Sequence, residues 1–141
     1  MDTKEIAAQI SEIRSNINNF LIRELKRYTI EGLAPSHGAI LHYLFTNKKM
    51  TMKDMAKAVR RDKSTLTALV CKLVSMGYVQ KETVADDQRS VTIRLTPEGK
   101  KLEPVFREIS DNLLQTIWRG IDEAEQKEVM RILKKIGTNV Q

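Results

Sequence analysis

The chain has 141 residues, a single cysteine and a formal net charge of +6. This length is typical of one domain that buries its own core, and the lone cysteine excludes an internal disulfide framework. The chain has no run of about 18 apolar residues and its first residues are charged, so we expect no membrane span and no secretion signal, and we place the protein in the cytoplasm.

Two helices are predicted in the first third of the chain. The first covers residues 3–28, where apolar residues recur at alternating steps of four and three and so form one narrow stripe along a helix. A Gly- and Pro-containing break follows. The second, short helix covers residues 35–47, because proline loses no hydrogen bond in a first helical turn. The stripe of the first helix consists of Ile6, Ile10, Ile13, Ile17 and Phe20.

The centre of the chain is predicted to form a helix-turn-helix. Thr51 is suited to cap a helix of about two turns, Asp62 is suited to cap a second helix, and Gly77 is suited to end it. Only about three residues join the two helices, which is the spacing of this motif. The second helix would therefore be the recognition helix of a DNA-binding unit.

The excess positive charge lies in the same part of the chain. Residues 48–101 carry 13 basic and 6 acidic residues, a balance of +7, whereas the other residues carry 11 basic and 12 acidic ones. Such a concentration of positive charge is typical of a polyanion-binding surface. A solvated helix face is the alternative interpretation of the same charges.

The second helix of the motif has a face that suits the major groove of DNA. At about 100° per residue, its apolar residues fall on one arc and small, uncharged residues fall on the opposite side. A solvated face would ordinarily carry Lys and Glu, whereas base edges require short side chains with cations beside them for the phosphates. A small-residue interface with another helix is the alternative. The outward residues are Ser64, Thr67, Ala68, Cys71 and Ser75, and the inward ones are Leu66, Leu69, Val70 and Leu73.

A β-hairpin is predicted directly after this helix, with strands at residues 78–84 and 90–95 and an exposed tip at residues 85–89. Its place after a helix-turn-helix identifies it as a wing. Arg89 in the tip can enter a narrow minor groove, where negative potential favours a guanidinium, and Asp87 can orient that side chain through a paired contact. The packed face of the hairpin is expected to carry Val91, Ile93 and Leu95.

Two further amphipathic helices are predicted after the wing. Thr96 can cap the first of them and Pro97 fits its first turn, while Pro104 is expected to kink it. The second begins near the sequence "DEAE". Together with the first helix of the chain, these helices offer more apolar surface than one small winged helix covers, so we expect a partner chain. Their apolar residues include Leu113, Ile117, Val129, Leu133 and Ile136.

Two motifs carry a resemblance to a known family. The recognition-helix pattern "D.ST.T..V..L...G" stands here as "DKSTLTALVCKLVSMG", and the wing pattern stands as Asp87, Arg89 and "RLTPEG". With these motifs the chain resembles the MarR family of bacterial and archaeal transcriptional regulators over nearly its whole length. Ala68 and Cys71 depart from the residues that are frequent at their positions, so the bases read are expected to differ from the common pattern.

The resemblance implies a mainly α fold with a small β-hairpin wing. One domain, residues 1–141, would hold a winged helix-turn-helix at about 48–100 between dimerisation helices at about 3–30 and 101–138. It further implies a homodimer that binds a pseudo-palindromic operator, usually as a repressor, and that is often released by a small molecule. The family places such ligands between the first, second and fifth helices, where His37, Ile40 and Leu41 would line the pocket.

The expected partners are double-stranded DNA, a second copy of the chain and a small-molecule effector. A protein-interaction winged helix without specific DNA binding and a redox-responsive regulator that uses Cys71 are the alternatives. We expect no enzyme, cofactor or metal site, because His37 and His42 point about 140° apart on a helix and cannot share a metal ion. DNA contacts are expected from Arg61, Lys63, Ser64, Thr65, Thr67, Ala68, Lys72 and Arg89.

Overall fold

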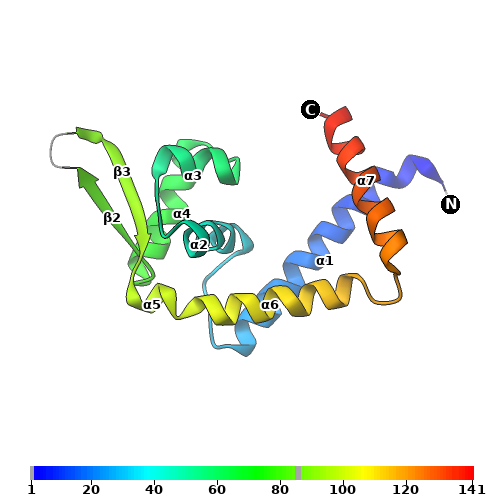
Figure 1. Ribbon diagram of the computed structural model, residues 1–141, viewed down its shortest axis with the longest axis horizontal. Coiled ribbons are helices and arrows are strands. Elements are labelled where there is room, and N and C mark those ends of the chain that lie inside the picture. Colours follow the sequence, from blue (N-terminus) through cyan, green and yellow to red (C-terminus); the bar gives the residue numbers. More distant parts are fainter. Residues whose placement is uncertain (1, 85–86) are drawn as a thin grey trace. The chain divides into compact units, whose positions relative to one another are not determined.

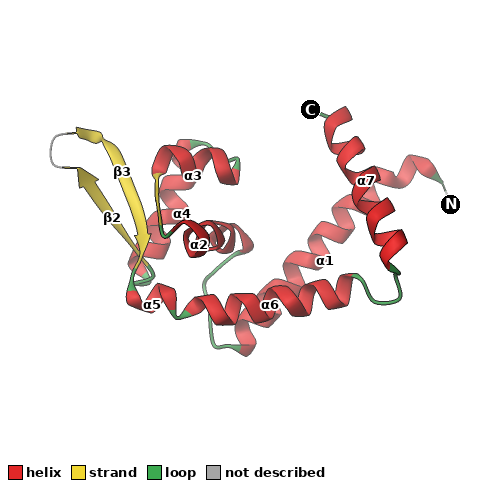
Figure 2. Cartoon of the chain, in the orientation of Figure 1, coloured by secondary structure: helices red, strands yellow, loops and turns green. Residues whose placement is uncertain are grey.

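The computed structural model of the protein describes residues 2–84 and 87–141, and the side-chain surroundings of residues 84–89 lie outside this description. The chain divides into two compact units, Met1–Ile109 and Ser110–Gln141. The described residues are mainly helical and contain one three-stranded sheet (Figure 2). This arrangement confirms the predicted fold class.

The first unit begins with the two predicted helices. A short 3-10 turn, η1 (Thr3–Glu5), leads into α1 (Ile6–Arg27), and α2 (Pro35–Asn47) follows after a loop. The sequence did not indicate how α2 is capped. The N–H of Ala34 donates to Nδ1 of His37 at 2.9 Å, so a histidine side chain satisfies a backbone donor at the start of this helix.

The predicted helix-turn-helix consists of α3 (Met52–Val59) and α4 (Lys63–Ser75). Both predicted caps are present, because the side chains of Thr51 and Asp62 accept hydrogen bonds from backbone N–H groups at 3.1 and 2.7 Å. The turn between the helices begins at Arg60, which has the left-handed conformation with a φ of 55°.

One apolar core holds the first unit together. It joins the C-terminal end of α1 to the helix-turn-helix, the sheet and the start of the C-terminal helices. The residues of α2 lie at its centre, since three of them have no exposed surface. The fully or almost fully buried side chains are Ile40, Leu41, Leu44, Met55, Leu66, Val70, Leu73, Val79 and Ile93.

The sheet contains β1 (Lys49–Thr51), β2 (Val79–Val84) and β3 (Asp87–Leu95) in the antiparallel order β1-β3-β2. The strands β2 and β3 form the predicted hairpin, which extends beside α4 (Figure 1). The prediction that β3 begins at residue 90 is wrong, because Asp87 pairs with Val84 across a register shift and the strand starts there. The sequence did not predict β1.

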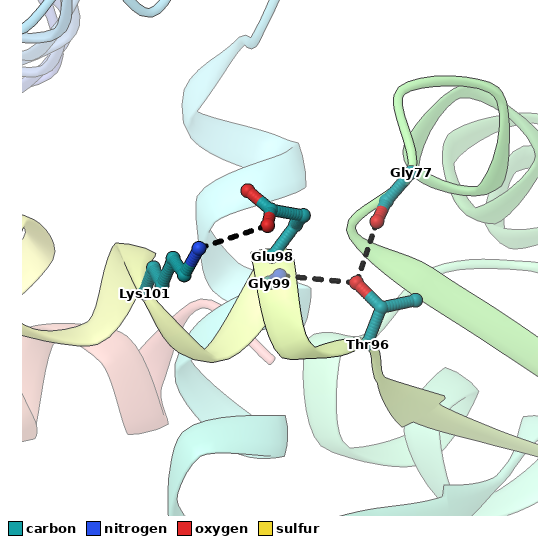
Figure 3. Close-up of polar contacts among 5 residues, drawn as sticks. All are labelled: Gly77, Thr96, Glu98, Gly99 and Lys101. Carbon is teal, nitrogen blue, oxygen red and sulfur yellow. Dashed lines mark hydrogen bonds and ion pairs between the residues drawn. The ribbon is translucent and has the colours of Figure 1, made fainter.

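The base of the hairpin is held by a network around Thr96 (Figure 3). Its hydroxyl donates to the carbonyl of Gly77 at 2.5 Å and accepts from the N–H of Gly99 at 3.0 Å. Its own N–H donates to the carbonyl of Tyr78 at 3.0 Å. Gly77 ends α4 with a φ of +82°, which suits glycine. One threonine therefore joins the end of α4, the wing and the next helix.

The helix predicted after Thr96 is interrupted, as expected. It consists of α5 (Pro97–Lys100) and α6 (Leu102–Ile117), which are separated at Lys101. Pro104 lies in the first turn of α6 and has no N–H to donate to the carbonyl four residues earlier. The interruption between α5 and α6 lies where this hydrogen bond would have closed a turn.

The second unit contains the end of α6 and the last helix, α7 (Glu123–Asn139). Two reciprocal hydrogen bonds of 2.9 Å between Asp122 and Glu125 form a capping box at the start of α7. In the described part of the chain, no helix is both long enough and apolar enough to cross a membrane.

The helices at the two ends of the chain carry exposed apolar side chains. Ile6 and Ile13 of α1 keep 52% and 55% of their surface accessible, whereas the core of the first unit starts at Leu25. In α7 no residue is buried. The exposed apolar residues of these helices are Ile6, Ile10, Ile13, Ile22, Val129, Met130, Ile132 and Leu133.

Replacing Gly99 with alanine is expected to destabilise the protein. A Cβ at this position would lie 2.1 Å from the carbonyl oxygen of Tyr78, so the backbone at the base of the wing would have to move. We expect the free energy of unfolding to fall by roughly 1–3 kcal/mol, as for other overpacked sites, and urea titration followed by circular dichroism measures it.

The matched control is Gly38→Ala in α2. Its Cβ would meet only the Phe106 ring, at an ordinary 3.5 Å. Because alanine is favoured over glycine inside a helix by about 0.5–1 kcal/mol, this variant should be as stable as the parent or slightly more stable. A Gly99→Ala variant as stable as the control would mean that the backbone around Thr96 can shift with little loss of free energy of unfolding.

Candidate nucleic-acid interface

The two faces of α4 are arranged as predicted. Leu66, Val70 and Leu73 are buried in the core, and Leu69 is half-buried beside them. On the opposite side the exposed residues are short and uncharged, and Thr67 is half-buried at the edge of this surface. We call the face formed by Ser64, Thr67, Ala68, Cys71 and Ser75 the outer face of α4.

The hydroxyl of Thr67 already has one partner. Its Oγ1 donates to the carbonyl of Lys63 one turn earlier, at 2.7 Å. The hydroxyl oxygen still has acceptor capacity and the methyl group is unaffected. Thr67 is therefore equipped to accept from a base amine or to contact a thymine methyl, and it is less suited to donate to a base acceptor.

Cations surround the start of α4. Arg61 and Lys63 are exposed on either side of the Asp62 cap, and Lys53, Lys57 and Arg60 are exposed along α3. Ser64 and Thr65, which complete the first turn of α4, are also exposed. This places short polar side chains between flexible cations, as base and phosphate contacts together require.

Lys72 lies in a different environment from these cations. Its Nζ lies 3.7 Å from the point where a Cβ on Gly32 would be, so the ammonium lies against the loop before α2. Burial, and then the charge of Lys72, lower the pKa of His37 near the start of α2. The phosphate contact predicted for Lys72 stays a prediction.

The structure describes only the backbone of the two residues that were predicted to make the wing contacts. The backbone of Asp87 and Arg89 belongs to β3. Their side chains lie outside the described residues, as does the whole of Asp86. The pairing of Asp87 with Arg89 and the entry of Arg89 into a minor groove therefore stay predictions.

The structure adds Lys81 of β2, which the sequence analysis did not select. Its Nζ lies 3.6 Å from Sγ of Cys71, an exposed residue on the outer face of α4. The sequence held one sign of its unusual place. In the alternation of apolar and polar residues along β2, position 81 falls on the side where an apolar residue is expected. No local pattern indicated that this side chain would reach the recognition helix.

The residues predicted to line an effector pocket have other surroundings. Ile40 and Leu41 are fully buried in the core, and His37 is half-buried and caps α2. A pocket of about 310 Å³ lies nearby in the first unit, lined by the last turns of α1 and by residues 30–33. Within residues 2–84 and 87–141, no group of three His, Cys, Asp or Glu side chains is arranged to hold a metal ion.

Comparison with known proteins agrees with the geometry of this domain. Residues 33–99 match the winged helix DNA-binding domain family. The transcriptional regulator SarZ of Staphylococcus haemolyticus (strain JCSC1435) is 28% identical over 119 residues, which cover 82% of this chain and 80% of SarZ. The solved structure of a MarR transcriptional regulator from Methanosarcina mazei Go1 superposes with a TM-score of 0.81 at 23% identity, covering 97% of this chain and 96% of that one. Residues 33–99 thus form a winged helix DNA-binding domain, and the chain has the fold of this MarR regulator.

Another solved structure with a similar fold is the S. aureus MepR–DNA complex, with a TM-score of 0.83, 24% identity and coverage of 99% of this chain and 98% of that one. These comparisons confirm the resemblance predicted from the recognition-helix and wing motifs. They also confirm the prediction that the protein is a transcriptional regulator with a winged helix DNA-binding domain rather than an enzyme.

The cap of the recognition helix is expected to make stability depend on pH. Hydrogen bonds from the backbone and then the side chain of Thr65 lower the pKa of Asp62 below its ordinary value of 3.8. The stabilisation is therefore present above this ordinary pKa and is lost as the pH falls through the lower pKa of the folded state. Asp62→Ala should lower the melting temperature at neutral pH, and this deficit should shrink in acid.

Asp62→Asn is the control, because asparagine caps a helix equally well and does not titrate. Melting curves of the three proteins between about pH 7 and pH 3 measure the effect. A deficit of Asp62→Ala that stays constant over this range would mean that the ionised carboxylate does not stabilise the start of α4.

Proposed function

We propose that the protein is a homodimer that binds a specific pseudo-palindromic operator in cytoplasmic DNA and represses transcription there. A small-molecule effector that releases the DNA completes the proposal. The pocket of about 310 Å³ at the end of α1 is the observation behind this last part, and its volume lies at the lower limit for small-molecule sites.

The outer face of α4 is the observation that carries the proposal. Its side chains are short and uncharged, and they lie beside the exposed cations Arg61 and Lys63. A helix in the major groove needs short side chains to reach base edges and cations to bind the flanking phosphates. MepR, whose fold this chain shares, has been solved in complex with DNA, and this supports the same partner here.

The exposed apolar residues of α1 and α7 support the homodimer. One winged helix presents a single recognition helix, and such a module should bind little better than the nonspecific range of about 10⁻⁴ to 10⁻⁶ M. Two copies joined through their terminal helices would present two recognition helices about one DNA turn, roughly 34 Å, apart. The operator should then be an inverted repeat.

Selection of bound sequences from a random DNA pool tests the proposal as a whole. We expect an inverted repeat, with binding that weakens steeply as salt increases. A chain that selects no sequence and shows no salt-sensitive binding would instead be a protein-interaction winged helix.

Thr67→Val is expected to alter base preference. Valine keeps the shape and a methyl group of threonine but loses the hydroxyl acceptor, so discrimination should fall by about 1 kcal/mol or more at particular operator positions. Sequence selection followed by titration measures this change. Thr46→Val is the control, because its hydroxyl also donates to a helix carbonyl, at 3.4 Å, but it lies in α2, outside the helix-turn-helix. Equal effects of the two variants would contradict the proposed docking of this helix.

Ile10→Asp combined with Ile13→Asp should remove the dimer. Both side chains are exposed in one chain, so the substitutions should leave the fold of the first unit intact while placing charges in the proposed interface. Sedimentation should show monomers, and specific binding should be lost. Ser15→Asp is the control. It adds a charge on the other side of α1 and should change neither the dimer nor the specific binding. A double variant that stays dimeric and binds its operator would exclude α1 from the dimer contact.

A further inference from the structure

The strand β2 carries a charged residue on the side of the sheet that faces the core. In the register of the sheet, Lys81 lies directly opposite Ile93, which is fully buried, and Met50 lies opposite Ile93 on its other side. Residues directly opposite one another in an antiparallel pair project to the same face. Position 81 therefore belongs to the inner face of the sheet, where its neighbours are apolar.

The ammonium of Lys81 lies between the wing and the recognition helix. Its Nζ is 3.6 Å from Sγ of Cys71, and both residues are exposed. Since Cys71 belongs to the outer face of α4, the lysine stem bridges from the strand to that face. One positive charge is thus held between the two elements that approach DNA in a winged helix.

On the opposite face of the sheet, charged side chains are paired with one another. There, Arg94 and Glu82 form an ion pair of 2.7 Å between β3 and β2, with about half of each side chain exposed. Among the side chains that the structure describes, no carboxylate forms such a pair with Lys81. A thiol offers little counter-charge to an ammonium. The inner face therefore presents a positive charge that the described residues do not neutralise.

We propose that Lys81 binds a phosphate of the DNA strand that separates the major groove under α4 from the minor groove under the wing. This inference rests on the proposed DNA-binding function. When α4 lies in the major groove and the hairpin crosses to the adjacent minor groove, the sugar–phosphate backbone between the grooves must pass the junction of the two elements. A cation at that junction faces phosphate oxygens rather than base edges.

The chemistry of the contact decides what Lys81 contributes. A lysine ammonium is a compact point charge, and a phosphate contact carries no direct sequence information. Lys81 should therefore strengthen binding to every sequence and help to fix the register of the wing on the duplex. This role is distinct from that of Thr67, which is assigned to base choice.

The experiment compares charge removal on the two faces of the same sheet. Lys81→Gln and Lys49→Gln each remove one positive charge, but Lys49 lies opposite Arg94 on the other face. The full chain is titrated with its selected operator and with an unrelated duplex over a range of salt concentrations. For Lys81→Gln, the slope of log affinity against log salt should be shallower by about 0.9 for each protomer bound. Both duplexes should lose affinity by the same factor, with the largest loss at low salt.

Two further variants keep the test independent of folding. Lys81→Arg preserves the charge and should restore the slope, whereas Lys81→Met preserves the apolar stem, should melt like the parent and should still lose the slope. Lys49→Gln should leave the slope unchanged.

Equal slopes for Lys81→Gln and Lys49→Gln would overturn the inference while leaving the proposed function intact. A changed order of base preferences in Lys81→Gln would place the lysine on a base edge and overturn it as well. If the parent protein binds no DNA in a salt-dependent way, the proposed function fails and the inference fails with it.

Discussion

The hydroxyl of Thr96 is the contact on which the geometry of the DNA-binding unit depends. It donates to the carbonyl that follows α4 and accepts from an N–H in the first turn of α5, so one side chain fixes the end of the recognition helix, the base of the wing and the start of the next helix (Figure 3). A serine or threonine is required for both bonds, and the glycine three residues later is required because any Cβ would meet the Tyr78 carbonyl. These two requirements explain physically why the "LT..G" part of the wing motif has a threonine and a glycine at these positions.

Two acidic residues of this unit make contacts within the protein, whereas several of its basic residues are exposed. Asp62 accepts hydrogen bonds at the start of α4, and Glu82 pairs with Arg94 on the outer face of the sheet. Arg61 and Lys63, in contrast, are exposed around the first turn of the recognition helix. Exposed cations of this unit therefore include residues along α3, residues around the start of α4 and Lys81 beside the wing.

The sequence predicted those features whose cause is local. The apolar arc of α4, its Asp62 cap and its Gly77 stop all lie within one helix, and the structure has each of them. It did not predict β1, because three residues are too few to show an alternation, nor the start of β3 at Asp87, because a register shift depends on the partner strand. The contacts of Lys72 with the Gly32 loop and of Lys81 with Cys71 join segments that are distant along the chain, so no periodicity reports them.

The strand order β1-β3-β2 has a consequence for the protein when no DNA is bound. It leaves β1 and β2 as the edges of the sheet, and an unpaired edge is a template on which a strand of another molecule can add. One edge is only three residues long, and the other carries a lysine that points inward, so an added strand would have to bring its apolar side against a charge. The lysine that we assign to the DNA backbone is thus also a residue of the kind that opposes the addition of a further strand at a sheet edge.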